Sequence, residues 1–127
     1  MTKSKWRIIT NIMITIHQNS LYINNKLLNF NHNIETVIVM ESQVIVLLNI
    51  PNNCDDIDNI YSVGIDAKVQ WRIQSRSTLL DKYPKVPYVG MQFKDNMIIA
   101  NDFCGIRYII DSQNGCIVGR DADGRNW

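Results

Sequence analysis

Short apolar stretches recur along the chain, separated by Asn, Asp, Ser or Gly. Ile, Val and aromatic residues favour strands, whereas Asn, Asp and Gly favour turns, so this pattern predicts about ten short strands joined by tight turns. The expected strands are residues 7–17, 21–24, 26–30, 35–40, 43–50, 59–65, 68–73, 88–93, 97–101, 105–110 and 116–120.

Two of these stretches, residues 35–40 and 43–50, are apolar almost without interruption. A strand with one face in water alternates apolar and polar residues, so continuous apolar character predicts two central strands that are buried on both faces. The pair Asn24-Asn25 separates two other strands and tolerates the left-handed conformation that tight hairpins need. Antiparallel hairpins are therefore the expected unit of the fold.

Helical character is confined to residues 77–83, where Ser77 can cap a short helix before Pro84 ends it. Residues 51–58 and 74–87 are expected to be loops, and neither is long enough to separate two domains. We therefore predict a single all-β domain, residues 1–127, with little helix. Its antiparallel strands would form a sandwich, a barrel or propeller-blade-like sheets.

A faint internal repeat relates two segments of the chain. Residues 60–71 contain a strand, a turn led by Asp66 and a second strand that carries Trp71. Residues 105–118 repeat this order about 45 residues later with a longer turn, and residues 22–28 form a degenerate third copy. A period of this size matches one four-stranded propeller blade.

This pattern resembles the blades of pyrroloquinoline-quinone-type β-propellers, in which a strand ends at Asp, a turn holds Gly or Lys, and the next strand carries Trp. Residues 66–71 match the motif, whereas Gly119 stands near the position where the second copy would carry its Trp. The resemblance covers residues 60–120 and implies blade-like hairpins. It implies no cofactor, because cofactor-binding propellers need a full ring of blades, which is more than this chain can build.

The residues of this motif have structural roles that follow from their chemistry. Asp66 and Asp111 are expected to fix their turns by accepting hydrogen bonds from the backbone N–H groups that follow them. Trp71 is expected to be buried on a sheet face, with its indole N–H donating to one partner.

Composition removes several classes of function. The chain has 127 residues, is 46% hydrophobic and contains 20 Ile and 15 Asn. Its 13 Lys and Arg against 12 Asp and Glu give a net charge of +1, which provides no general attraction for nucleic acid or an anionic membrane. The longest apolar run, residues 44–48, is too short to span a bilayer. The N-terminal stretch lacks a signal cleavage site, so a soluble, cytoplasmic protein is expected.

The three cysteines, Cys54, Cys104 and Cys116, are an odd number at wide spacing and include no C-x-x-C pair. They favour a reducing compartment and buried free thiols. A bridge between Cys104 and Cys116 stays open as an alternative if their strands are neighbours.

No catalytic or metal-binding motif is present in the sequence. His17 falls at a strand end and His32 in an Asn-rich turn, where both are expected to be surface residues. We therefore expect a protein that is not an enzyme and that holds no metal or cofactor. An enzyme would need a pocket that brings one of these histidines together with a carboxylate or a cysteine.

Basic and aromatic residues surround the second expected loop, and together they could grip a phosphate and stack a base. Asp81 lies among them and no aromatic strand motif accompanies them, so nucleic-acid binding is not the preferred interpretation. The residues concerned are Arg72, Arg76, Lys82, Tyr83, Lys85 and Tyr88.

Asp55, Asp56 and Asp58 are the densest group of one charge, in the loop that follows Pro51. Such a group can be a solvated loop, or it can speed association with a basic partner protein. We select these three carboxylates as partner-binding residues and Tyr83 as an aromatic anchor.

In overall character, this small β protein rich in Ile and Asn resembles the immunity proteins encoded beside bacterial toxins. The resemblance implies a non-enzymatic protein-binding module that neutralises a nuclease-type toxin by occluding its active site. The alternative is a truncated propeller-like structural module that acts through self-association, for example as a homodimer, or by docking to a larger protein. Open sheet edges invite such pairing.

Overall fold

The computed structural model describes residues 12–52, 54–76 and 84–121. Within these ranges the protein is all-β, with eleven short strands and no α-helix. The strands are β1 (Ile14–His17), β2 (Ser20–Ile23), β3 (Lys26–Asn29), β4 (Ile34–Val39), β5 (Gln43–Leu48), β6 (Ile60–Gly64), β7 (Val69–Arg72), β8 (Tyr88–Lys94), β9 (Met97–Asp102), β10 (Arg107–Asp111) and β11 (Ile117–Asp121). The helix expected at residues 77–83 lies outside the described residues, and no helix within them could cross a membrane.

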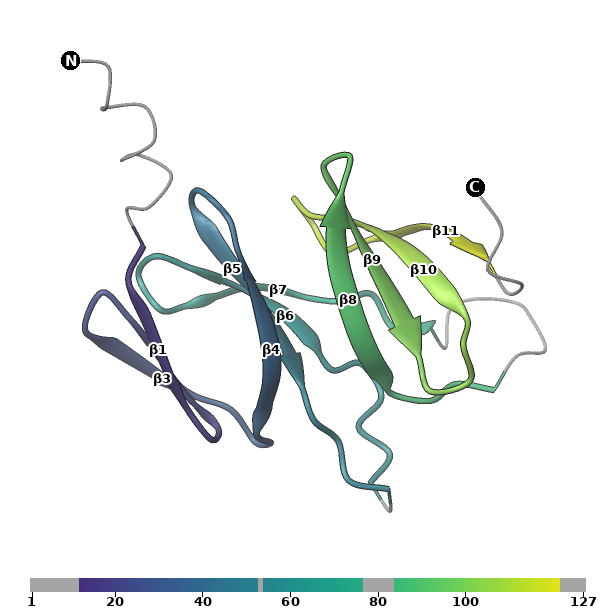
Figure 1. The fold of residues 1–127 in the computed structure, drawn as a ribbon, viewed down its shortest axis with the longest axis horizontal. Helices are drawn as coiled ribbons and strands as arrows, with labels where there is room; N and C mark the ends of the chain where they lie inside the picture. The colour runs from purple at the N-terminus through teal and green to yellow at the C-terminus, as the bar shows by residue number, and fades with distance from the viewer. Residues whose placement is uncertain (1–11, 53, 77–83, 122–127) are drawn as a thin grey trace.

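The strands form three antiparallel sheets, each of which follows the order of the chain. The first sheet contains β1–β3, the second β4–β7 and the third β8–β11 (Figure 1). Short turns join most of the neighbouring strands, since a tight hairpin connects adjacent antiparallel strands, whereas the longer loop of residues 49–59 connects β5 to β6. The predicted antiparallel, blade-like arrangement is confirmed.

Strand β5 is the centre of the molecule. All six of its residues are buried, and they alternate between two cores: Ile45 and Leu47 face the third sheet, whereas Val44, Val46 and Leu48 face the first sheet. The prediction of a central strand buried on both faces is therefore confirmed for this segment.

The same prediction is wrong for residues 35–40. Strand β4 is the edge strand of the second sheet, and Val39 on it is 46% exposed. Its apolar pattern resembles that of β5, but burial depends on which strands pair on either side. Among the described strands, β4 pairs only with β5.

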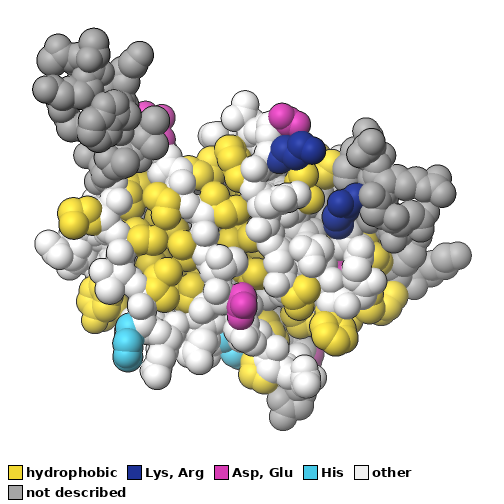
Figure 2. Space-filling model, viewed as in Figure 1, with side chains coloured by type: hydrophobic (Ala, Val, Ile, Leu, Met, Phe, Trp, Pro, Cys, Tyr) yellow, Lys and Arg dark blue, Asp and Glu magenta, His cyan; other side chains and the backbone are white. Residues whose placement is uncertain are grey.

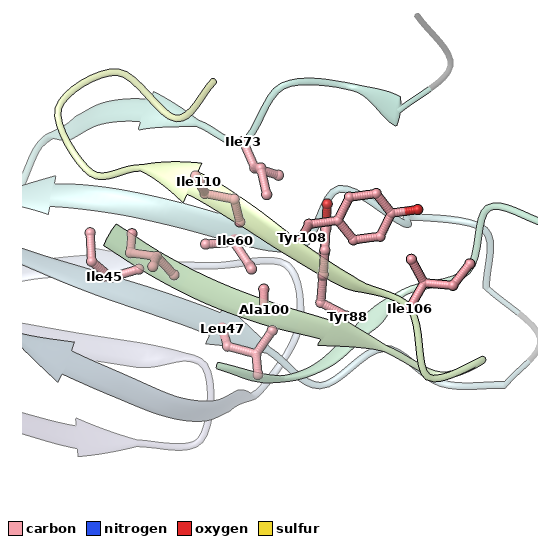
Figure 3. Close-up of a cluster of buried hydrophobic side chains, with 10 residues drawn as sticks. Ile45, Leu47, Ile60, Ile73, Tyr88, Ala100, Ile106, Tyr108 and Ile110 are labelled. Carbon is pink, nitrogen blue, oxygen red and sulfur yellow. The ribbon is translucent and has the colours of Figure 1, made fainter. Parts of the chain in front are cut away.

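Two hydrophobic cores separate the three sheets. One lies between the first and second sheets and contains Leu21, Ile23, Val46 and Val63. The other lies between the second and third sheets, and Figure 3 shows its side chains converging from both sides. Its buried members are Ile45, Leu47, Ile60, Ile73, Tyr88, Ile98, Ala100, Ile106, Tyr108 and Ile110.

The hairpin turns have the predicted chemistry. Asn24 and Asn25 take positive φ angles of 49° and 70°, which Asn tolerates better than most residues. The carboxylate of Asp66 accepts a hydrogen bond from the backbone N–H of Lys68 at 3.2 Å. The carboxylate of Asp111 accepts one from the backbone N–H of Gln113 at 2.8 Å. Both predicted Asp-led turns are confirmed.

Trp71 joins the second sheet to the third. Its side chain is half-buried against the core between these sheets, and its indole N–H donates to the backbone oxygen of Ser112 at 3.1 Å. The ring also lies against Gly115, so closely that an added Cβ there would be 2.5 Å from ring atom Cε3. The predicted core role and single indole partner are confirmed.

The three thiols are free, as predicted, but they are not buried. Cys104 and Cys116 are exposed, and Cys54 is partly exposed. Cys104 lies in the turn between β9 and β10, and Cys116 immediately precedes β11. Their positions in turns, rather than within strands, explain their exposure, and the alternative of a Cys104–Cys116 bridge is not realised.

Arg76 is completely buried, which overturns its place in a surface group for binding phosphate. Its guanidinium lies 4.1 Å from the ring centroid of Tyr88 and 5.2 Å from that of Tyr108. It donates hydrogen bonds to the carboxylate of Asp102 at 3.3 Å and to backbone oxygens of the neighbouring loops. A buried cation is stabilised by such partners, and here it ties two loops to the third sheet.

Tyr88 supports a prediction about alkaline stability. Burial raises its pKa, whereas an unfolded tyrosine loses its proton near pH 10. Above about pH 10 the folded protein therefore holds a proton that the unfolded chain has released, so the free energy of unfolding falls as pH rises. Tyr88→Phe is expected to make this decline shallower by up to about 1.4 kcal/mol per pH unit.

The same substitution should raise stability at neutral pH. The Tyr88 hydroxyl is buried and has no hydrogen-bond partner in the described part of the chain, so its removal should add about 1 kcal/mol. Urea unfolding from pH 7 to 11 measures both effects, with Tyr22→Phe at an exposed tyrosine as control. A Tyr88→Phe variant that is less stable than wild type at pH 7 would contradict this prediction.

Candidate functional site

A cleft of about 620 Å³ opens between the second and third sheets. Its walls are the end of β5 with the loop that follows, the start of β8, and the turn after β9. Ile50, Pro51 and Pro87 contribute apolar surface, and Phe103 and Val89 are 73% and 49% exposed. Cavities of this size and apolar character are typical of binding sites.

Two β-bulges shape the cleft. Strand β4 has an irregular register between Ile34 and Thr36, which leaves Glu35 as the extra residue. Strand β8 has the same irregularity between Tyr88 and Gly90, which leaves Val89 as the extra residue. Bulges redirect side chains and are common beside binding sites. Both extra residues line the cleft, one from each sheet.

Glu35 brings negative charge to a mostly apolar cleft. Its carboxylate is exposed, and Oε1 accepts a hydrogen bond from the side-chain amide of Asn49 at 2.9 Å. Among the described residues that line the cleft, none is Lys or Arg. The site therefore combines apolar walls with one oriented carboxylate.

The predicted acidic group lies in the loop beside this cleft, but its members have different environments. Asp55 is exposed. Asp56 is partly buried and forms ion pairs with Arg72 and, at 3.3 Å, with His32. Asp58 is partly buried, and its backbone oxygen accepts a hydrogen bond from Nε of Arg72 at 2.7 Å. Of the three residues, Asp55 is thus the exposed one, while Tyr83, the selected anchor, lies outside the described residues.

Arg72 organises this loop, a role that the sequence did not indicate. Its guanidinium lies 5.1 Å from the ring centroid of Tyr61 while it bonds to Asp56. Burial raises the pKa of Tyr61, and the positive charge of Arg72 opposes that effect. Arg72 therefore holds the acidic loop against the second sheet.

His32 is partly buried beside Cys54 and Asp56, which corrects the expectation of a surface turn residue. Its Nε2 atom lies 3.9 Å from Sγ of Cys54 and 3.3 Å from a carboxylate oxygen of Asp56. Cys54 also lines the cleft. This cluster brings a histidine together with a cysteine and a carboxylate, which is the combination that an enzyme would need.

The geometry of this cluster differs from that of an activated nucleophile. In a catalytic triad the nucleophile and the carboxylate contact opposite ring nitrogens of the histidine, which holds the ring in one tautomer. Here both groups approach Nε2, and Asp56 is also bonded to Arg72. Among the described residues, no group of three or more His, Cys, Asp and Glu side chains is placed to hold a metal ion.

Sequence reasoning missed Glu35, Val89 and Phe103, the residues that give the cleft its charge and its exposed apolar surface. A carboxylate inside an otherwise apolar stretch was the signal for Glu35. The sequence contains no comparable signal for Val89 or Phe103, because their contribution depends on how the second and third sheets pack.

The fold is similar to that of the computationally designed Ika8 protein, which is known from its crystal structure. The TM-score is 0.62 at 9% sequence identity, and the match covers 88% of this chain and 34% of the designed chain. This chain therefore spans about a third of the length of that protein, and the likeness concerns the fold.

No curated protein matches the chain. A family model does match it, from residue 11 to residue 122, and this span includes all three sheets. The chain therefore belongs to the family described as a domain of unknown function, DUF7957.

Proposed function

We propose that the protein is a non-enzymatic protein-binding module whose binding face consists of the cleft and the adjoining exposed carboxylate of Asp55. The observation that carries this proposal is the exposed apolar surface of Phe103 and Val89 around a cleft of about 620 Å³. Exposed apolar side chains that surround a concave site are typical of protein contacts.

The electrostatics of this face indicate a positively charged partner. Asp55 is exposed beside the cleft and Glu35 lies within it. Carboxylates on a binding surface speed association with a basic protein, whereas buried apolar contacts slow its release. In its most specific form, the proposal is an immunity protein that covers the active site of a nuclease-type bacterial toxin.

Affinity capture from bacterial lysate at low salt tests this function. A partner bound to the tagged wild-type protein is expected to be depleted by about tenfold or more with Phe103→Asp. Val118→Asp, which places the same charge on an exposed residue of β11 outside the cleft, should leave capture unchanged. Absence of any stoichiometric partner, or equal capture by both variants, would count against the proposed face. A captured nuclease that is inactive in the complex would support the immunity role.

A second candidate function is self-completion of the stack of sheets by another copy of the chain. Tyr22 and Leu27 face each other across β2 and β3 and are 40% and 49% exposed. Figure 2 shows apolar side chains gathered over the first and second sheets in that view. The resemblance of residues 60–120 to pyrroloquinoline-quinone-type blades favours this second function, because such blades pack face to face in rings. A monomer by sedimentation would exclude it, whereas an oligomer that Tyr22→Asp dissociates would support it.

A further inference from the structure

We infer that the cleft is a subsite for an apolar side chain that lies next to a positive charge on a segment of the partner protein. This inference rests on the proposed function and specifies the chemistry of the partner's contact. The argument comes from the shape of the cleft, the source of its charge and the way that charge is oriented.

The apolar part of the subsite is exposed without a partner. Phe103 is 73% exposed in the turn after β9, and Val89 is 49% exposed at the bulge of β8. Ile50 and Pro51, in the loop after β5, line the same cleft. An apolar group inserted here would remove apolar surface of this loop and of the third sheet from water, which is favourable.

The charge of the subsite selects a cation. Glu35 is a charged residue of the lining, and no Lys or Arg accompanies it among the described lining residues. Asn49 holds Oε1 of Glu35, so the carboxylate is oriented before any partner arrives.

The two bulges indicate that this arrangement is built into the fold. Each bulge inserts one residue that has no partner on the neighbouring strand, and bulges redirect side chains. The two inserted residues, Glu35 and Val89, both line the cleft. A carboxylate and an apolar side chain thereby meet from two different sheets.

Three small probes of similar size distinguish this subsite from a purely apolar one. Phenethylammonium carries a cation, 2-phenylethanol is neutral and 3-phenylpropanoate carries an anion. In titrations followed by backbone amide chemical shifts, we expect shifts at residues 48–50, 52, 86, 88 and 89. The cation should bind about fivefold more tightly than the alcohol, with the anion weakest.

Matched variants then test the role of the carboxylate. Glu35→Gln should abolish the preference for the cation while the alcohol still binds. Glu41→Gln removes the same charge from an exposed residue in the turn between β4 and β5, and it should retain the preference. Probes that leave the cleft amides unshifted, or a preference for the cation that survives Glu35→Gln, would overturn the inference.

The outcome is separable from that of the capture experiment. If the probes behave as expected but no partner is captured, the subsite stands and the proposed function fails. If a partner is captured through Phe103 while the probes show no preference for the cation, the function stands and this inference fails.

Discussion

Replacing Arg76 by alanine is expected to lower the free energy of unfolding by about 3–5 kcal/mol, because removal of one member of a buried ion pair leaves the other charge unpaired. Arg76 and Asp102 are both buried, and their closest charged atoms are 3.3 Å apart. The arginine also covers the rings of Tyr88 and Tyr108. Its loss would therefore remove packing as well as charge.

The pH dependence of this loss follows from Asp102. Burial raises the pKa of its carboxyl, and the charge of Arg76 and hydrogen bonds from the backbone N–H groups of Ile106 and Cys104 oppose that effect. Without Arg76 the pKa should rise further. When folding raises the pKa of an acid, the free energy of unfolding increases as pH falls and decreases as pH rises. The variant therefore gains stability relative to wild type on acidification. The difference in the free energy of unfolding between wild type and Arg76→Ala should shrink from about pH 7 towards pH 5.

Urea unfolding measures these differences, and two variants serve as controls. Arg72→Ala removes an arginine whose ion pair with Asp56 is partly exposed, and it should cost at most about 1 kcal/mol. Arg76→Met combined with Asp102→Asn removes both charges while an amide oxygen can still accept the turn hydrogen bonds, and it should recover part of the loss. Equal effects of Arg76→Ala and Arg72→Ala would contradict the importance of the buried pair.

Replacing Gly115 by alanine is expected to lower the free energy of unfolding by about 2–4 kcal/mol, because two penalties act together. Gly115 has a φ of +76°, a conformation that residues with a Cβ adopt at a cost. The added Cβ would also lie 2.5 Å and 2.8 Å from two ring atoms of Trp71. The indole cannot move freely, since its N–H is bonded to Ser112.

A comparison with Gly105→Ala separates the backbone penalty from the steric penalty. Gly105 has a φ of +89°, but an added Cβ there would meet no atom within 4 Å. Gly105→Ala should therefore cost about 1–2 kcal/mol, from the backbone alone. In a Trp71→Leu background, the cost of Gly115→Ala should fall towards that of Gly105→Ala. If both glycine variants cost the same in the wild-type background, the contact with Trp71 would not be the cause.

Much of the local structure could be predicted because it depends on residues close in the sequence. Asn24-Asn25 and Asp66 specify hairpins through conformations and hydrogen bonds within a few residues. Trp71 was recognised as a core residue because a large apolar side chain with one donor has few other stable positions in a β protein.

The candidate site could be predicted only in part, because some of its contacts join residues that are distant in the sequence. The loop with Asp55 and Asp56 was recognised from its local density of charge, and it does border the cleft. Its electrostatics could not be derived from the sequence, because Arg72 and His32 reach Asp56 from segments far away along the chain. Asp55 is the exposed residue of that group.

The sequence by itself determined the all-β class, the positions of the strands and the turns between them, since each of these depends on propensity and spacing over a few residues. Only the tertiary structure decided that β5 is central and β4 an edge strand, that Arg76 is buried, and that Glu35 and Val89 share a cleft. These features depend on strand order, bulges and the packing of one sheet on another. Such contacts join residues distant in the chain, and no local pattern specifies them.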